Sequence, residues 1–233
     1  MRNLLVIILL SLSVQIGHAQ PSDADKLGMA IEYFQSGKYH EALLLLQKLD
    51  KEYHLNPRFR AYLGVCYYYE WDFKNACKYL DMMLPELQVF SPAEQTVYYF
   101  TNAESHFNLQ EYDKAIPLYE RMLMLCRDNE KPEALYRLGF CYLFGRDWPN
   151  AYEYFNTSLA SYLRFRNTPD QQARIEQIRN MINGCREKLP EDYFLAEDTL
   201  PADTLKANHQ PADTLDIKRL KASMDVILKT VGR

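Results

Sequence analysis

The chain has 233 residues, of which 48% are hydrophobic and 25% are charged, and its formal net charge is −4. This composition is typical of a globular protein with a sizeable core, and it excludes the strongly basic surface by which proteins bind nucleic acid. Glycine is scarce, at 8 residues, while tyrosine is abundant, at 18, which favours packed helices over a sheet with many tight turns.

Residues 1–19 have the organisation of an export signal. Arg2 supplies a positive charge, and residues 4–14 form an apolar run that is too short to cross a bilayer. Gly17 and Ala19 provide the small residues that cleavage after Ala19 requires. We therefore expect an exported chain, periplasmic or secreted, whose mature form has no membrane span. A retained N-terminal anchor is the alternative.

A fourfold pattern occupies residues 23–166. Four alanines each follow an aromatic residue by three positions, and a small residue stands nine positions before each aromatic. The alanines are Ala42, Ala76, Ala115 and Ala151, the aromatics are Tyr39, Phe73, Tyr112 and Trp148, and the small residues are Ala30, Gly64, Ala103 and Gly139. Because small residues let helix axes approach and an aromatic can fill a bend, each unit is predicted to be a helical hairpin.

This pattern resembles the tetratricopeptide repeat, a helix-turn-helix unit of 34 residues. The Leu-Gly pair of the family's first helix is present at Leu63-Gly64 and at Leu138-Gly139. The resemblance implies an all-α fold, a right-handed solenoid of helical hairpins. We expect the solenoid to cover residues 23–189, in which residues 169–189 form a helix that closes its open end.

The bend between the two helices shows a departure from the family pattern. Gly37 matches the family's turn glycine in the first repeat. Trp71 and Gln110 stand at that position in the second and third repeats, and Gly145 is displaced from it by one residue in the fourth. We expect Trp71 to pack over its bend.

Capping signals mark three predicted helix starts. Asn56, Ser91 and Thr168 each precede a proline, which suits the first position of a helix. Glu94 and Gln171 follow Ser91 and Thr168 by three residues, which completes the pattern of a capping box.

The composition changes after Leu189. Residues 190–216 hold seven acidic residues and a single lysine, which predicts a flexible acidic linker. Residues 217–230 are predicted to form a short amphipathic helix with basic residues outside its apolar face. This helix is expected either to fold back on the solenoid or to dock on a partner or an anionic surface.

No motif indicates catalysis, so we predict no catalytic, cofactor-binding or metal-binding residue, and no enzyme activity. The five histidines lack metal-ligand spacing, and the sequence has no phosphate-binding glycine loop. His106 stands where other repeats carry tyrosine, so it is interpreted as a core residue. Cys66 and Cys141 share one repeat position, which favours apolar packing, although a bridge between Cys66 and Cys77 is an alternative in an oxidising compartment.

The resemblance also implies a binding groove, because the first helices of tetratricopeptide hairpins line a concave face. Carried onto this chain, the groove positions include the aromatic residues Phe34, Tyr68, Tyr69, Phe100, Phe107, Tyr136, Phe140 and Phe144. Polar groove positions are few: Gln35, Glu104 and Asn108. The groove lacks the basic cluster that binds a terminal carboxylate in some family members, so a hydrophobic segment or helix is the expected ligand. Packing between neighbouring helices, or cover by residues 217–228, is the alternative.

These features favour one function over two others. The favoured function is a non-catalytic adaptor of a bacterial cell-envelope assembly that binds a protein segment in its groove. The second is a carbohydrate-binding or enzyme-accessory subunit that uses the aromatic residues as stacking platforms, which is weakened by the shortage of polar partners. The third is a structural repeat that associates with itself, and the sequence leaves the oligomeric state open.

Overall fold

The computed structural model describes residues 21–194, and these contain helices and no strand. The predicted signal peptide, the predicted helix 217–230 and the linker beyond residue 194 lie outside the described residues. The described residues divide into two compact units, with the boundary between Leu55 and Asn56.

The first unit is a single hairpin of α2 (Asp23–Gln35) and α3 (Tyr39–Tyr53). Ser22 and Asp25 form a capping box at the start of α2. Ala30 and Ala42 have no exposed surface, so the two small residues of the first repeat lie where its helices approach each other.

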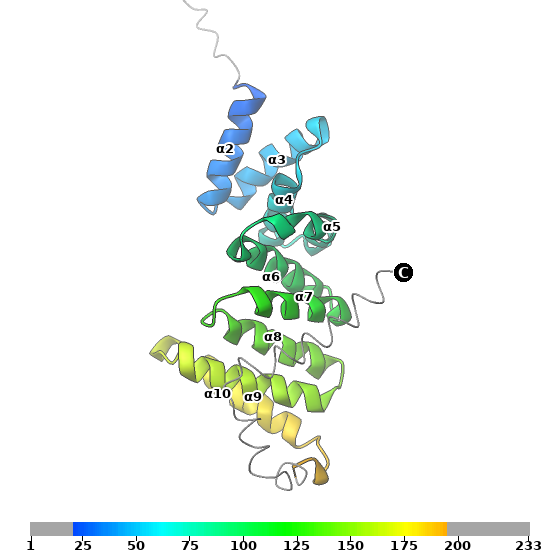
Figure 1. Ribbon diagram of the computed structural model, residues 1–233, viewed down its shortest axis with the longest axis vertical. Helices are drawn as coiled ribbons and strands as arrows, with labels where there is room; N and C mark the ends of the chain where they lie inside the picture. The colour runs from blue at the N-terminus through cyan, green and yellow to red at the C-terminus, as the bar shows by residue number, and fades with distance from the viewer. Residues whose placement is uncertain (1–20, 195–233) are drawn as a thin grey trace, which may run out of the picture. The chain divides into compact units, whose positions relative to one another are not determined.

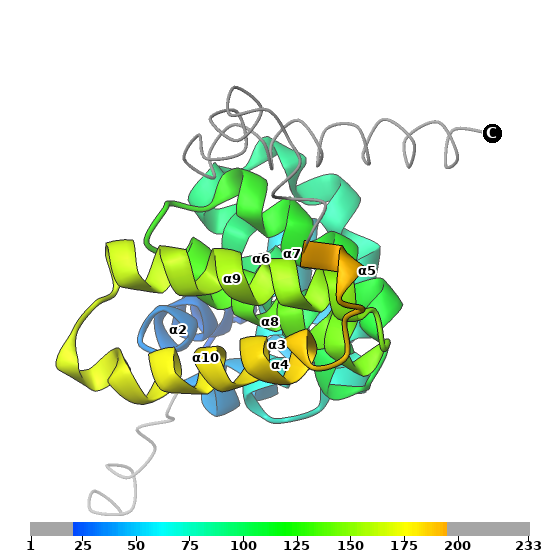
Figure 2. The ribbon, with the colours of Figure 1, turned by 90° about the horizontal axis from the view of Figure 1, so that it is seen from below.

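The second unit stacks three further hairpins and a closing helix (Figure 1). The hairpins are α4 (Pro57–Tyr69) with α5 (Phe73–Met83), α6 (Pro92–Asn108) with α7 (Tyr112–Leu125), and α8 (Lys131–Phe144) with α9 (Trp148–Phe165). A 3-10 helix, η1 (Leu84–Val89), connects α5 to α6, and another, η2 (Pro169–Gln171), precedes α10 (Gln172–Arg186). Figure 2 shows α10 alongside α9, whose exposed side it closes. The all-α fold of helical hairpins is thus confirmed.

The small residues of the pattern determine how closely each hairpin can close. A Cβ atom on Gly64 would lie 2.5 Å from Leu80 Cγ, and one on Gly139 would lie 2.6 Å from Phe155 Cδ1. Both contacts are far shorter than carbon atoms tolerate, so only glycine fits there. Each aromatic of the pattern is the first residue of its second helix, as expected for a side chain that fills the bend.

The residue two positions before each second helix adopts the same unusual backbone. Gly37, Trp71, Gln110 and Arg146 have φ angles of 72°, 62°, 62° and 60°. The fourth repeat therefore keeps the register of the other three, since Arg146 adopts the left-handed conformation and Gly145, with φ of −73°, does not. Only glycine adopts this conformation without a steric penalty.

Relief of this penalty should stabilise the protein. The substitutions Gln110→Gly and Arg146→Gly are each expected to raise the free energy of unfolding by about 0.5–1 kcal/mol, because the left-handed backbone is strained for any residue with a Cβ. Urea denaturation measures the change, and Gln110→Ala controls for loss of the side chain. A glycine variant no more stable than its alanine counterpart would contradict the prediction.

Two predicted caps differ from expectation. The Ser91 hydroxyl accepts a hydrogen bond from the Glu94 backbone N–H, but the Glu94 carboxylate pairs with Arg58 of α4, at 2.9 Å, and does not complete a capping box. Thr168 makes no side-chain cap, because Pro169 opens the 3-10 helix η2 and α10 begins only at Gln172. At Ser91, an ion pair between Glu94 and another helix takes the place of the second capping-box hydrogen bond. At Thr168, a short 3-10 helix stands where an α-helix was predicted to start.

The chain turns back after α10. The Tyr193 hydroxyl donates to Glu153 Oε1 over 3.0 Å, and the ring of Phe194 lies edge-on to that of Tyr152, 5.7 Å between centroids. Residues 190–194, predicted to begin a flexible linker, are thus packed against α9, because their aromatic side chains find a surface of matching character. The acidic composition on which the linker was predicted gives no indication of this packing against α9.

Candidate binding groove

The first helices α4, α6 and α8 of the second unit contribute to one cavity of about 330 Å³. Its lining residues are Tyr68, Tyr69, Trp71, Phe73, Glu104, Asn108 and Arg137. Tyr68, Tyr69, Glu104 and Asn108 occupy groove positions implied by the resemblance, so the fold brings these four together. Three helices from three different hairpins therefore line one cavity.

Four aromatic residues line the cavity. The centroids of Tyr68 and Tyr69 are 5.2 Å apart at 78°, those of Tyr68 and Phe73 are 6.0 Å apart at 57°, and those of Trp71 and Phe73 are 6.1 Å apart at 64°. The pairs Tyr68–Tyr69 and Trp71–Phe73 have the edge-to-face arrangement that aromatic rings favour. Trp71 is 77% exposed, so it stands out into solvent and does not cover its bend as expected.

A buried carboxylate lies at the polar side of the cavity. Glu104 is 3% exposed, and its Oε1 accepts a hydrogen bond from the Tyr119 hydroxyl over 2.5 Å. The same Oε1 lies 2.8 Å from Arg137 Nε, close enough for an ion pair although the N–H does not point at the oxygen. Burial raises the pKa of the Glu104 carboxyl above its usual value, and the positive charge of Arg137 opposes that shift.

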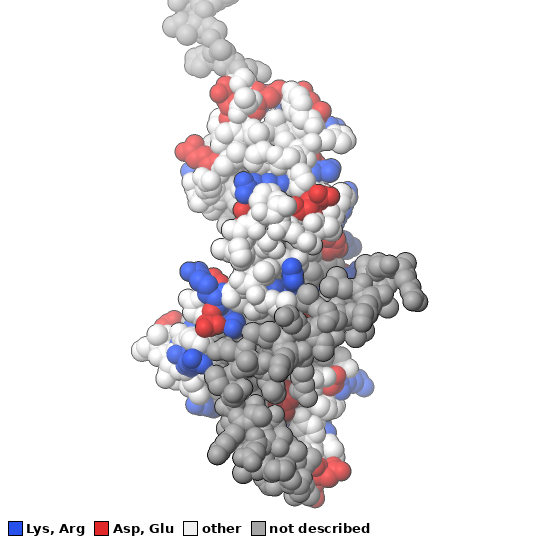
Figure 3. Space-filling view, viewed as in Figure 1, with Lys and Arg blue, Asp and Glu red and all other residues white. Residues whose placement is uncertain are grey.

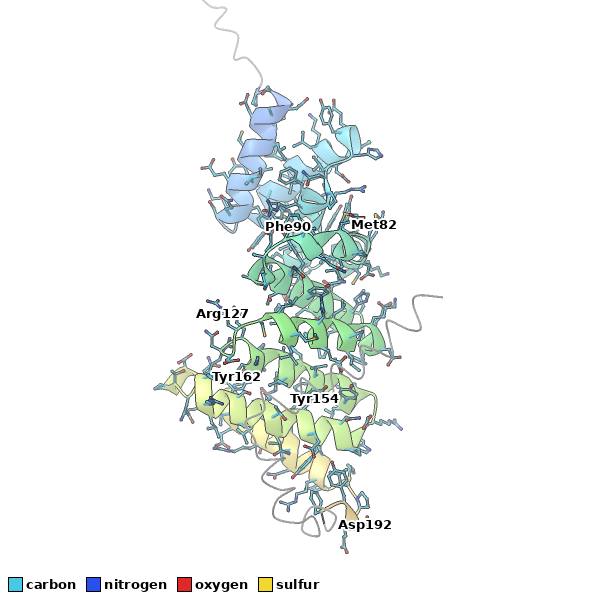
Figure 4. All side chains as sticks on the ribbon, in the orientation of Figure 1. Met82, Phe90, Arg127, Tyr154, Tyr162 and Asp192 are labelled. Atoms are coloured by element: carbon cyan, nitrogen blue, oxygen red, sulfur yellow. The ribbon has the colours of Figure 1, made fainter. Side chains whose placement is uncertain are left out.

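Alternating charges continue from this carboxylate to the closing helix. Arg137 Nε also lies 3.6 Å from Glu133 Oε1, and Arg174 Nη1 of α10 approaches the same oxygen at 3.9 Å. Glu133 Oε2 accepts a hydrogen bond from the hydroxyl of Tyr162, which projects from α9 (Figure 4), over 2.6 Å. Each charge in this row is thus compensated within the row itself.

A second aromatic cluster adjoins the cavity. Phe107, Tyr112, Phe140 and Phe144 form a chain of ring contacts with centroid distances of 5.1–6.2 Å. The Arg137 guanidinium lies 5.3 Å from the Phe107 ring centroid, so it joins the cluster to the cavity. Phe144 is 50% exposed. We call the cavity residues and this cluster together the aromatic face.

The other predicted groove residues lie elsewhere. Tyr136 is 3% exposed and packs against Phe155, with the Arg174 guanidinium 4.1 Å from its ring centroid. It therefore belongs to the core, because α10 covers the position that faces a groove in the repeat pattern. Phe100 is half-buried, with its ring against that of Tyr119, and Phe34 belongs to the first unit, where its ring contacts Tyr39.

Sequence reasoning missed Arg137, Trp71 and Phe73 as lining residues. The sequence predicted a groove without a cluster of basic residues, and the cavity is lined by one basic residue, Arg137. The spacing of four between Glu133 and Arg137 was an available signal, since such pairs meet on one side of a helix. Figure 3 shows basic and acidic residues interspersed on the visible face of the described chain.

The interpretation of His106 as a core residue is confirmed. Its imidazole ring is also charged, which the sequence did not predict. The side chain is 2% exposed, with Nδ1 2.6 Å from Glu111 Oε2 and Nε2 3.1 Å from Asp81 Oδ1. Both ring nitrogens face carboxylates, so both must donate and the ring is protonated. Burial alone would lower the pKa of His106, but hydrogen bonds led by that to Asp81 raise it to about 10. At the same repeat position, Tyr67 and Tyr142 stack on tyrosines of their second helices.

Metal sites, membrane-spanning helices and disulfides can also be assessed within residues 21–194. No three His, Cys, Asp or Glu side chains gather there as metal ligands would, and no helix in this range is long and apolar enough to cross a membrane. All five cysteines are free thiols, so the Cys66–Cys77 bridge is not formed in the structure. Cys66 and Cys141 are buried, in agreement with a packing role.

Comparisons with known proteins agree with the repeat pattern. The tetratricopeptide repeat family profile matches residues 133–162, which include most of the fourth hairpin. The solved structure of MamA AMB-1 superposes with a TM-score of 0.52 at 17% identity, covering 74% of this chain and 96% of that one. MamA MSR-1 gives 0.50 at 15% identity, covering 71% and 95%. No curated protein matched the sequence.

At such identities the MamA structures show a shared fold and nothing about a shared ligand. The fold, the family profile over the fourth hairpin and the fourfold register of small and aromatic residues agree with one another. The described chain is built from helical repeats of the tetratricopeptide type.

Proposed function

We propose that this protein is a non-catalytic scaffold of the bacterial cell envelope that binds a protein segment on the aromatic face. The observation that carries the proposal is the exposure of Tyr69, Trp71 and Phe144 on one surface, around a cavity lined by further rings. Contiguous exposed apolar surface of this kind is typical of interaction sites, and aromatic residues are enriched at the centres of protein interfaces.

The form of the aromatic face favours an amphipathic segment as the ligand. The rings run from α4 across α6 to α8, and the polar groups beneath them are largely paired with one another. A ligand must therefore gain its binding energy from apolar contact, as an amphipathic helix does in a hydrophobic groove. The location in the envelope is supported by the sequence of residues 1–19, with its charged start, apolar run and small residues before the expected cut.

Carbohydrate binding is the second candidate, and the shortage of polar groups argues against it. A sugar that stacks on a ring needs several directed hydrogen bonds beside that ring, but the polar lining residues of the cavity are Glu104, Asn108 and Arg137. Glu104 and Arg137 pair with each other, and Asn108 donates its side-chain amide to the backbone oxygen of Glu104 over 2.7 Å. The groups that remain are too few to bind the many hydroxyls of a sugar.

Crosslinked capture from an envelope extract tests the proposed function. The double variant Tyr69→Ala with Phe144→Ala is expected to lose at least about tenfold of the captured partner, since two truncated hot-spot aromatics cost that much or more. Both side chains are exposed, so helicity measured by circular dichroism should not change. The matched control is Met82→Ala with Val89→Ala, two exposed apolar residues outside the aromatic face. Equal losses in both double variants, or no loss in either, would refute the proposal.

A further inference from the structure

We propose that the cavity of the aromatic face receives a positively charged side chain, lysine or arginine, from the bound segment. This inference rests on the proposed function and specifies the chemistry of the ligand at one point. The cavity residues that carry the argument are the four rings of Tyr68, Tyr69, Trp71 and Phe73, together with the carboxylate of Glu104.

The rings are arranged as a cage. Neighbouring rings meet at 57–78°, so their faces are not parallel and cannot form one flat stack. The negative face of each ring attracts a cation placed within about 6 Å of its centre, and tryptophan is the strongest of the aromatic residues in this respect. A flat apolar group would contact only one of these faces at a time.

Two polar lining residues of the cavity, Glu104 and Asn108, retain side-chain oxygens that can accept hydrogen bonds. The two contacts of Glu104 both fall on Oε1, which leaves Oε2 of a cavity-lining carboxylate as an acceptor. The Asn108 amide nitrogen is engaged by the Glu104 backbone oxygen, so its side-chain oxygen is the group left for a ligand. A lysine ammonium or an arginine guanidinium carries only donors and matches this set.

Arg137 does not reverse this preference. Its Nε lies between Glu104 and Glu133, and its guanidinium lies over the Phe107 ring. The positive charge of Arg137 is thus compensated by two carboxylates before any ligand arrives. Because the Glu104 charge is compensated in the same way, the preference for a cation comes from the negative faces of the four rings, which would repel an anionic side chain.

The side chain of Trp71 is a second observation. All four turns share a left-handed backbone, with φ of 60–72°, so this conformation belongs to the repeat and does not itself mark a site. The equivalent residues Gly37, Gln110 and Arg146 are glycine or flexible polar residues. Among these four turns, an aromatic side chain stands at the one beside the cavity, where its ring adds a face to the cage.

Four matched peptides test the inference on the full chain after signal removal. They share the sequence acetyl-Leu-Ala-X-Ala-Leu-amide, with lysine, arginine, norleucine or glutamate at X. Binding is followed by nuclear magnetic resonance, through the indole N–H of Trp71 and the side-chain amide of Asn108. The lysine and arginine peptides are expected to bind at least about tenfold more tightly than the norleucine peptide, and the glutamate peptide most weakly, as a desolvated cation–π site predicts.

Two variants identify the cage as the source of the preference. Tyr69→Leu keeps an apolar side chain but removes a ring, and Glu104→Gln keeps the shape but removes the charge. Each should bring the charged peptides to within about twofold of norleucine, because each removes part of the attraction for a cation. Tyr69→Leu remains informative if the buried Glu104→Gln substitution prevents folding. Phe144→Leu, outside the cavity, is the control and should weaken all peptides alike while preserving their order.

The outcomes separate this inference from the proposed function. If norleucine binds as tightly as lysine and arginine, the cation inference is wrong and segment binding on the aromatic face stands. If no peptide shifts either resonance at millimolar concentration, the inference is also wrong. If charged peptides bind only after removal of residues 195–233, that segment blocks the cavity in the full chain, and the inference that the cavity receives a partner's side chain is wrong.

Discussion

Replacing Gly139 with alanine is expected to lower the free energy of unfolding by about 2–3 kcal/mol, the cost of forcing extra volume into a packed core. The added Cβ would lie 2.6 Å from both Cδ1 and Cε1 of Phe155, whose ring has no exposed surface and contacts Tyr136 and Phe140. The ring cannot move away without displacing these neighbours. The α8/α9 hairpin must therefore open, and its packing contacts are lost.

Gly184→Ala provides the matched control. Gly184 also lies inside a helix, α10, but a Cβ there would meet nothing within 4 Å. Alanine should raise stability at this position by about 0.5–1 kcal/mol through its higher helix propensity. The two substitutions are chemically identical and are expected to have opposite signs in urea denaturation. Similar stability changes of either sign would show that close approach of α8 and α9 is not what requires glycine.

His106→Gln is expected to cost about 2 kcal/mol of stability near pH 6, because it replaces a cation held between two carboxylates by a neutral amide whose hydrogen bonds to them are weaker. The imidazolium joins Asp81 of α5 to Glu111 at the start of α7, so it connects two successive repeats. Its partners are about half-exposed and can be rehydrated, which keeps the loss below that of a fully buried pair. Urea denaturation of both proteins at that pH measures the difference.

The same substitution should change how stability depends on pH. The pKa of His106 is raised from 6.5 to about 10 in the folded protein. Its contribution is therefore fully present below about pH 6.5 and is lost as the pH rises through about 10. Stability of the wild-type protein should fall across this range, while His106→Gln should show a smaller decrease. Parallel pH profiles for the two proteins would mean that folding does not raise the pKa of His106.

Much of the local structure could be predicted from the sequence, and the predictions that failed did so for identifiable physical reasons. The fourfold register, the hairpins and the core role of His106 followed from spacing. Tyr136 was placed on the groove because the repeat pattern does not show that α10 and Arg174 cover it. Arg137 was missed because its position in the repeat is not a groove position, and its role arises from contact with Glu104 on another hairpin.

The amino-acid sequence by itself determined where each helix pair bends and which residues face each other within a hairpin. These contacts join residues close in the chain, and the helical period of 3.6 residues sets them. Only the tertiary structure decided that Trp71 stands in solvent beside a cavity and that Glu104 is buried next to Arg137. Those properties depend on how α4, α6 and α8 stack, and stacking joins side chains that no local spacing relates.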